Sequence, residues 1–536
     1  MRKKLVIFCL LIATMLLTMV LLTACNSGAD GNYDNDTQPS GTASATNSPQ
    51  PAEPVKEKVL RISRSWEDSS WDPATFTGAD QLVFVPAIFE TLVCLEKSGE
   101  YSPLLAQEWD ITDDGLTYIF RLRRGVQFHH GYGEMTAADI KFSFERNLDK
   151  AVASIHIEDL NMANIAAIET PNPYTAVFKL HQPDADFLSR CSSYAGIILS
   201  QAAFADKGLD GCALFPIGTG PFQFDKGNPG QQTECVKFKE YWGEVAQVDR
   251  MINTVISDTN TNYSAFENGE LDAICVYYLD KVNEYKNAGY QVLYVPTWQI
   301  LYVGVNMQTE PFQNEKVREA FFAAIDPQYY LDALFYGTET FSGGYIPPSS
   351  KYALSGYMKS TYDPAKAKAL LAEAGYANGV KVTLWSVNDD LSPAPALVTQ
   401  MQLQDAGFTV ELQLVDFGVF LSKVRSGEAG MWMLYNTTPP LADETINRYT
   451  SGFYPGSNWI GLQDKIYDDL VAQGLAAATQ AEKAQYFDAA QKRLLDLQVL
   501  YPISTYGYNL VMQPYISGVE VQGNNTLSYK NVEINK

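Results

Sequence analysis

The sequence lacks the short motifs on which many catalytic and metal sites are built. It contains no G-x-S-x-G turn, no H-E-x-x-H pair and no G-x-x-x-x-G-K-[ST] loop, which argues against common hydrolase and nucleotide-binding mechanisms. Only four histidines are present, and the adjacent pair His129 and His130 has only His156 and His181 as further candidate ligands. A turn after a strand explains the pair better than a metal site does. We therefore predict a protein that is not an enzyme and that needs no cofactor and no metal.

Cysteine is scarce and shows no functional spacing. Of seven cysteines, Cys9 and Cys25 lie near the N-terminus. The other five are Cys94, Cys191, Cys212, Cys235 and Cys275. No C-x-x-C pair occurs among them, so neither a zinc site nor a redox motif is indicated. In an exported protein one or two disulfides could form, with Cys191 and Cys212 nearest in sequence, and buried free thiols are an equal alternative.

Positive charge is in short supply. The chain has 39 Lys and Arg against 62 Asp and Glu, a formal charge of −23 at pH 7. This balance argues against nucleic acid as a partner and against electrostatic adhesion to anionic lipid. It could favour a cationic ligand, but solubility outside the cell is the simpler explanation.

The longest apolar run of the sequence lies at its N-terminus. Basic residues 2–4 precede the apolar stretch 5–22, as in an export signal, although the run is also near the length of a membrane-spanning anchor. Residues 22–25, LTAC, resemble a bacterial lipobox, in which the cysteine is acylated and the peptide bond before it is cut. We predict a lipoprotein signal peptide over 1–24 and a lipid such as palmitate on Cys25. That lipid would hold the protein on the extracytoplasmic face of the cell membrane.

The composition changes sharply after the leader. Residues 26–58 have almost no large apolar side chains and are rich in Asn, Ser, Thr, Gly and Pro, so they cannot form a core. We predict that 25–58 comprises the lipidated cysteine and a disordered linker. The whole chain is 46% hydrophobic and 12% aromatic, and the remaining length is enough for two or three domains with substantial cores.

Helix and strand signals alternate along the globular part. Residues 363–375 predict a helix, because Asp363 is a good N-cap, Pro364 suits the first helical position and Gly375 can end the helix. The following elements are predicted as a strand, a helix and a strand, over 380–387, 394–407 and 408–417. This alternation indicates an α/β fold in which helices cover a sheet.

Six groups of residues carry a stronger signal because of their order. They are "LLAQEWDITDDGLTYIFRLRRGVQFHHG" with "MTAADIKFSFER", then "FPIGTGPFQF", "YWG", "SAFENGELDA", "VREAFFAAID" and "YDPAKAKALLAEAGY". Each is weak alone. Together, from about Leu60 to the C-terminus, they resemble the peptide/nickel-type family of extracellular solute-binding proteins, which includes dipeptide- and oligopeptide-binding lipoproteins of ABC importers.

The resemblance implies a two-lobed periplasmic-binding-protein-like fold of the large, three-domain type. Domain I would comprise 59–94, 215–300 and 507–536, domain II would comprise 95–214, and domain III would comprise 301–506. The expected function is that of a monomeric substrate-binding lipoprotein. It would capture a solute, by family a peptide-like one, between its lobes and deliver it to a membrane permease.

One glycine-rich segment is expected to have a structural role. It consists of Gly218, Thr219, Gly220 and Pro221. The glycines permit backbone angles closed to other residues and the proline stiffens the exit. The segment therefore suits a tight crossing between the lobes, and an ordinary turn is the alternative.

The residues that hold the ligand in this family are matched only in part by this sequence. Dipeptide binders of this family pair an Asp with the peptide amino group and an Arg with its carboxylate, which suits charged termini. The corresponding stretches here are "MWMLYNTTPPLADETINRY" and "WSVNDDLSPAP". The first offers Asp443, displaced from the usual place, and the second has no arginine, which puts an ordinary short peptide in question.

An oligosaccharide or another neutral solute is therefore an alternative ligand, which the missing arginine favours. In that case Tyr435, Asn436 and Thr437 would supply neutral hydrogen bonds. Trp385 and Trp432 are candidates for stacking on an apolar or sugar face, unless they fill the core. If the amino-group pocket is retained in altered form, Asp443 is its best candidate. A surface hydrolase or an adhesin is a weaker alternative, because no nucleophile motif or repeat is visible.

Overall fold

The computed structural model describes most of the chain from Glu57 to the C-terminus. The described ranges are 57–64, 70–76, 84–228, 230–335, 339–389, 391–438, 441–523 and 525–536. The predicted signal peptide, Cys25 and nearly all of the predicted linker lie outside them. Within these ranges no helix has the length and apolar character that a membrane crossing requires.

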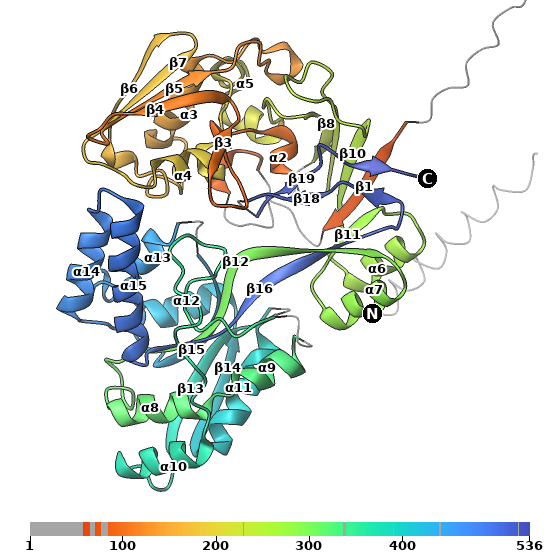
Figure 1. Cartoon of the computed structure of the whole chain (residues 1–536). Coiled ribbons are helices and arrows are strands. Elements are labelled where there is room, and N and C mark those ends of the chain that lie inside the picture. Colours follow the sequence, from red (N-terminus) through yellow and green to blue (C-terminus); the bar gives the residue numbers. More distant parts are fainter. Residues whose placement is uncertain are drawn as a thin grey trace, which may run out of the picture. The chain divides into compact units, whose positions relative to one another are not determined.

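A ten-stranded sheet runs through the described part of the chain (Figure 1). Its order is β14-β13-β15-β12-β16-β11-β1-β10-β9-β8. The strands are β1 (Val59–Arg64), β8 (Phe222–Asn228), β9 (Gln232–Lys237), β10 (Arg250–Val255), β11 (Ala273–Val276), β12 (Gln291–Val305), β13 (Val380–Val387), β14 (Phe408–Val415), β15 (Met431–Thr437) and β16 (Leu500–Met512). The two longest strands, β12 and β16, lie in the middle and pair antiparallel along most of their length.

These two strands join two lobes. Lobe A contains β1 and β8–β11, and lobe B contains β13–β15. At one end β16 pairs with β11 of lobe A, and at the other end β12 pairs with β15 of lobe B. The register between them shifts between Pro296 and Gln299. We call residues 296–299 and 504–508 the hinge section, because there the paired strands β12 and β16 pass from one lobe to the other.

Lobe A also carries a smaller antiparallel sheet with the order β4-β5-β7-β6. Its strands are β4 (Ala106–Ile111), β5 (Thr117–Leu122), β6 (Ile165–Asn172) and β7 (Thr175–Leu180). Strand β5 alternates half-buried and buried side chains. Buried side chains of this sheet, such as Phe120 on β5 and Phe178 on β7, form a separate core with helices α3 (Ala137–Glu145), α4 (Phe187–Ser192) and α5 (Gln201–Leu214).

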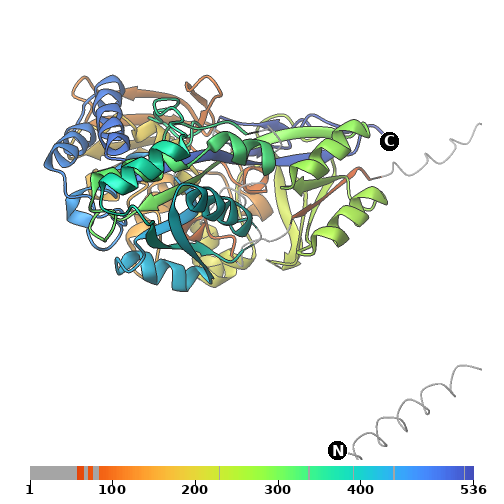
Figure 2. The same cartoon turned by 90° about the horizontal axis from the view of Figure 1, so that it is seen from below.

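Helices surround the sheet of lobe B, and the green-to-blue part of the chain gathers there in both views (Figures 1 and 2). The lobe B helices are α8 (Glu315–Ala324), α9 (Pro327–Ala333), α10 (Pro364–Glu373), α11 (Pro393–Asp405), α12 (Phe417–Arg425), α13 (Asp443–Asn447), α14 (Lys465–Leu475) and α15 (Gln480–Asp496). Lobe A adds α2 (Val85–Ile88), β2 (Val93–Leu95), β3 (Tyr101–Pro103), α6 (Thr259–Glu267), α7 (Leu279–Asn287) and the short strands β17 (Ile516–Ser517), β18 (Glu520–Val521), β19 (Leu527–Ser528) and β20 (Glu533–Ile534).

The predicted elements between 363 and 417 are confirmed. Helix α10 begins at Pro364, and the Asp363 side chain accepts a hydrogen bond from the Lys366 backbone N–H at 2.9 Å. Gly375 follows with φ +94°, a left-handed conformation that favours glycine. Strand β13, helix α11 and strand β14 occupy the next three predicted ranges to within two residues.

The structure corrects the expected role of residues 218–221. The segment connects α5 to β8, so it crosses between the two sheets of lobe A, whereas β12 and β16 join the lobes. The glycines are required there, because a Cβ on Gly220 would lie 2.6 Å from the Ala87 carbonyl oxygen and one on Gly218 would overlap the Ile88 backbone.

The histidine pair is part of the same crossing. His129 is buried; its Nδ1 accepts a hydrogen bond from the Gly218 N–H at 3.2 Å, and its Nε2 lies 2.9 Å from the Gly220 carbonyl oxygen. Burial lowers the pKa of His129 to about 3, so the ring is neutral and holds the crossing. No cluster that could bind a metal occurs among the described residues.

The five cysteines of the described part are free thiols, and four of them are buried. The buried four are Cys191, Cys212, Cys235 and Cys275. Of the two alternatives left open by the sequence, free thiols therefore describe this structure.

Candidate functional site

The carboxyl ends of strands from both lobes meet at the hinge section. Val276 at the end of β11 pairs with Asn509. Thr437 at the end of β15 pairs with Gln299, which in turn pairs with Tyr506. In open α/β sheets, ligands bind outside the carboxyl ends of strands, so the hinge section is the candidate binding site.

Aromatic side chains line this section. The rings of Tyr435 and Tyr506 lie with centroids 5.2 Å apart, and Tyr277 stacks on Tyr506 at 6.4 Å with an interplanar angle of 5°. Tyr194 and Trp298 form a further pair at 6.1 Å. Such faces suit an apolar or planar part of a ligand.

A buried carboxylate stands beside these rings. Glu339 is 7% exposed, and its carboxylate accepts hydrogen bonds from the Tyr294 hydroxyl at 3.1 Å and the Thr505 hydroxyl at 2.9 Å. Burial raises the pKa of Glu339. Burial also raises the pKa of Tyr435, and the charge of Glu339 adds to that increase. Sequence reasoning missed Glu339, because its partners lie 45 and 166 residues away along the chain.

The predicted polar contacts of β15 lie at or near the hinge section. Tyr435 and Thr437 are half-buried, and Asn436 is buried. The Thr437 hydroxyl accepts a hydrogen bond from the Gln299 amide at 3.3 Å, and the Asn436 side-chain oxygen accepts one from Arg448 at 3.3 Å. Asn436 is therefore already bonded within lobe B, whereas Tyr435 and Thr437 are the more accessible of the three.

The two tryptophans occupy different environments. Trp432 is fully buried and packs edge-on against Tyr302 and Trp459, each at 5.5 Å. The core-filling alternative therefore describes Trp432, and we no longer count it as a ligand contact. Trp385 is half-buried on β13, with the Lys423 ammonium 5.4 Å from its ring centre.

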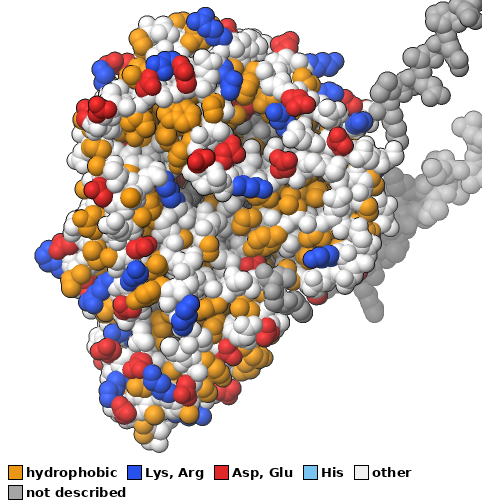
Figure 3. All heavy atoms as spheres, viewed as in Figure 1, with side chains coloured by type: hydrophobic (Ala, Val, Ile, Leu, Met, Phe, Trp, Pro, Cys, Tyr) orange, Lys and Arg blue, Asp and Glu red, His pale blue; other side chains and the backbone are white. Residues whose placement is uncertain are grey.

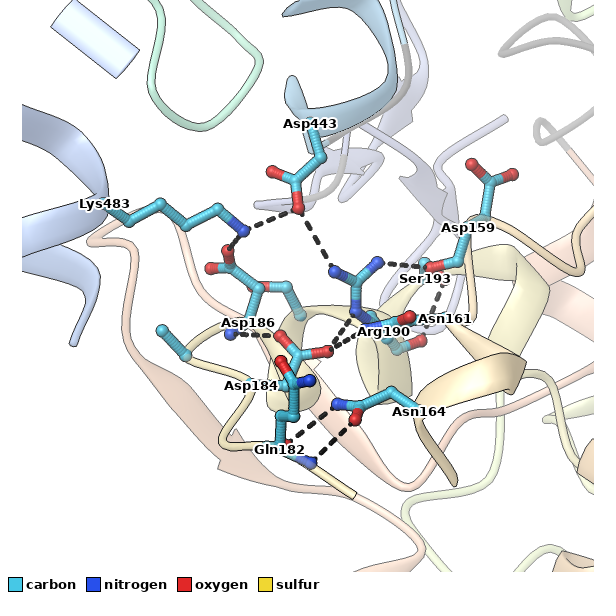
Figure 4. Close-up of polar contacts among 12 residues, drawn as sticks. Asp159, Asn161, Asn164, Gln182, Asp184, Asp186, Arg190, Ser193, Asp443 and Lys483 are labelled. Carbon is cyan, nitrogen blue, oxygen red and sulfur yellow. Dashed lines mark hydrogen bonds and ion pairs between the residues drawn. The ribbon is translucent and has the colours of Figure 1, made fainter. Parts of the chain in front are cut away.

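Asp443 is held by cations of the protein itself (Figure 4). Its Oδ2 accepts from Lys483 Nζ at 2.6 Å and from Arg190 Nη2 at 3.2 Å. Arg190 belongs to lobe A and also bonds Asp184 at 2.8 Å. Asp443 is the candidate for an altered amino-group pocket, and in this structure its Oδ2 is bonded by one cation of each lobe.

Asp186 makes the most buried contact between the lobes (Figure 4). It lies in lobe A directly before α4 and its side chain is 0% exposed. Three groups of lobe B bond it: Lys483 Nζ at 2.7 Å, Lys351 Nζ at 2.8 Å and the Tyr352 hydroxyl at 2.7 Å. Burial alone would raise the pKa of Asp186, but the two ammonium groups outweigh burial and lower it. The cluster of Asp184, Asp186, Arg190, Lys351, Asp443 and Lys483 is called the interlobe ion cluster below.

The exposed surface gives no comparable signal. On the face shown in Figure 3, acidic and basic side chains are interspersed, and neither sign forms a large patch. Recognition of a small ligand is therefore better sought at the hinge section than on this face.

Two lobes joined by a two-stranded hinge, with a polar and aromatic site between strand ends, define a two-lobed periplasmic binding protein. Residues 100–456 match the family model described as "Bacterial extracellular solute-binding proteins, family 5 Middle". The chain belongs to this family of solute-binding proteins, which serve ABC importers.

Similar proteins agree with this assignment. The glutathione-binding protein GsiB of Escherichia coli (strain K12) is 31% identical over 451 residues, covering 82% of this chain and 86% of GsiB. The Helicobacter pylori periplasmic protein DppA, in complex with peptide STSA, is 27% identical with a TM-score of 0.74, covering 89% and 98% of the two chains. NikA from Brucella suis, in complex with Fe(III)-EDTA, shares the fold with a TM-score of 0.80 at 22% identity and 89% and 100% coverage. GsiB and DppA are both named as binding proteins.

Proposed function

We propose that this protein captures a short peptide or a peptide-like solute at the hinge section and delivers it to an ABC permease. The observation that carries the proposal is the meeting of aromatic rings and buried polar groups at the ends of β11 and β15. The similarity to a glutathione-binding protein and to a protein in complex with a peptide supports this ligand class. The proposed contacts are Tyr435, Thr437 and the neighbouring Tyr506, with Trp385 at the end of β13.

A neutral solute such as an oligosaccharide is the second candidate. It is favoured by the absence of arginine in the stretch 385–395 and by the hydroxyl and aromatic character of the β15 end. A sugar ring could stack on a tyrosine face and bond to hydroxyl groups without any charged partner.

A thermal-shift screen of the protein without residues 1–24 tests both candidates. The probes are short peptides, glutathione, oligosaccharides and nickel. A ligand present at 100 times its Kd should add about 2.7 kcal/mol to the free energy of unfolding. Stabilisation by peptides is expected, and stabilisation by oligosaccharides alone would favour the second candidate. Conversion of the bound solute, detected by mass spectrometry, would contradict a pure binding function.

The membrane anchor belongs to the same proposal. We expect a signal peptide over 1–24 and a lipid on Cys25, motivated by the LTAC tetrapeptide. A linker over 25–58 would give the lobes reach from the membrane surface. The three-domain boundaries and the monomeric state also remain predictions.

A further inference from the structure

Several buried carboxylates of the described chain pair with a cation of the protein, whereas Asp139 accepts hydrogen bonds at the start of α3. Asp186 pairs with lysines, Asp72 pairs with Arg146 at 2.6 Å, and Asp272 pairs with Lys536 at 2.9 Å. No ion pair between described residues includes Glu339, and no positive charge offsets the burial that raises its pKa. A buried carboxylate without a cation is costly to keep charged.

The other buried glutamate with a raised pKa is Glu90, which lines a cavity of about 330 Å³ within lobe A. It accepts hydrogen bonds from Thr219 at 2.8 Å, Tyr241 at 2.8 Å and Trp242 at 2.9 Å, all within lobe A. Glu90 is thus bonded by three neutral donors of one lobe, and the positive charge of Lys530 acts on it as well.

Glu339 instead lies on the junction of the lobes. Its two hydroxyl partners belong to β12 and β16, the strands of the hinge. Two residues later, Phe341 bridges to Ser504 in the hinge section. Its bonds come from two hydroxyls and the Gly507 backbone, whereas a carboxylate can accept about four hydrogen bonds. Capacity therefore remains for one more donor.

We infer that Glu339 pairs with the ammonium group of the bound solute, as in the amino terminus of a peptide. This inference rests on the proposed function and assigns to Glu339 the role for which Asp443 was the conditional candidate. An ammonium group would supply the missing cation and the fourth donor together. The tyrosine faces of the hinge section would assist, since cations are attracted to aromatic rings. The ligand class is then a solute with a free primary amine, and a neutral sugar is disfavoured.

Calorimetry with paired ligands tests the inference. The probes are the tetrapeptide Ser-Thr-Ser-Ala and glutathione, each with a free and with an acetylated amino group. The proteins are the wild type, Glu339→Gln and the control Glu373→Gln, whose partner Lys316 lies at an exposed site of lobe B. Acetylation should weaken binding to the wild type and the control by about 30-fold, and it should have little effect on Glu339→Gln.

The outcomes separate the two claims. An equal acetylation penalty in the wild type and in Glu339→Gln would overturn the inference and leave the proposed function intact. Binding of neither free probe to the wild type would overturn both. Should Glu339→Gln fail to fold, Glu339→Asp retains the charge and should keep an acetylation penalty. If Glu339→Asp binds the free peptide but shows no acetylation penalty, the inference is also overturned.

Discussion

Replacing Asp186 with asparagine should loosen the contact between the lobes. All three groups that bond this carboxylate belong to lobe B, while Asp186 itself belongs to lobe A. In a hinged binding protein the open form separates such partners and returns them to water. The substitution therefore acts on the closed form, and the open form should change little.

The magnitude follows from the partners that remain. Breaking a buried ion pair by removing one partner costs about 3–5 kcal/mol. Here Lys483 keeps Asp443 at 2.6 Å, and Lys351, whose side chain is 28% exposed, can turn to water. We therefore expect a smaller loss of about 2–4 kcal/mol, which lowers the ratio of closed to open molecules roughly 30- to 1,000-fold.

Solution scattering and calorimetry measure this shift. Asp186→Asn should increase the radius of gyration without ligand, or, where the wild type is already open, weaken ligand binding by the same factor. The matched control is Asp469→Asn, which removes an exposed pair with Lys465 on α14 and should change neither quantity. Unchanged scattering and unchanged affinity in Asp186→Asn would refute the closure role of the interlobe ion cluster.

Three further changes test other parts of the structure. Burial raises the pKa of Glu90 to about 7 from 4.5, so the unfolded chain releases this proton first, and this residue should lower the free energy of unfolding by about 3 kcal/mol between pH 4.5 and 7. In urea titrations the fall over this range should be smaller in Glu90→Gln than in the wild type by about that amount, and an equal fall in both proteins would contradict the assignment. Gly220→Ala places a Cβ 2.6 Å from a carbonyl oxygen and should lower the free energy of unfolding, measured by thermal unfolding, by about 1–3 kcal/mol. In the control Gly418→Ala the new Cβ meets open space, and the free energy of unfolding should not fall. Cys25→Ala should leave the protein in the soluble fraction or with its leader uncleaved, and normal processing with membrane retention would disprove lipidation.

Local chemistry explains why some elements could be predicted. The cap at Asp363, the glycine at 375 and the alternation in β5 are signals within a few residues of the structure they specify. The six ordered segments likewise predicted the family, which residues 100–456 confirm. The glycines at 218 and 220 indicated a tight crossing of the chain. A glycine pattern cannot say which parts of the structure such a crossing connects, and here it connects the two sheets of lobe A.

The α/β elements between 363 and 417 and the family could thus be read from the sequence. The tertiary structure alone decided which side chains meet between the lobes. Asp443 is bonded to Arg190, 253 residues away, and Asp186 to Lys483, 297 residues away. Trp432 fills the core, which the sequence left open, and Glu339 bonds to the hinge strands, which no sequence pattern indicated. The physical reason is that periodicity reports whether a side chain is buried, while the partner that balances a buried charge is fixed only when distant segments come together.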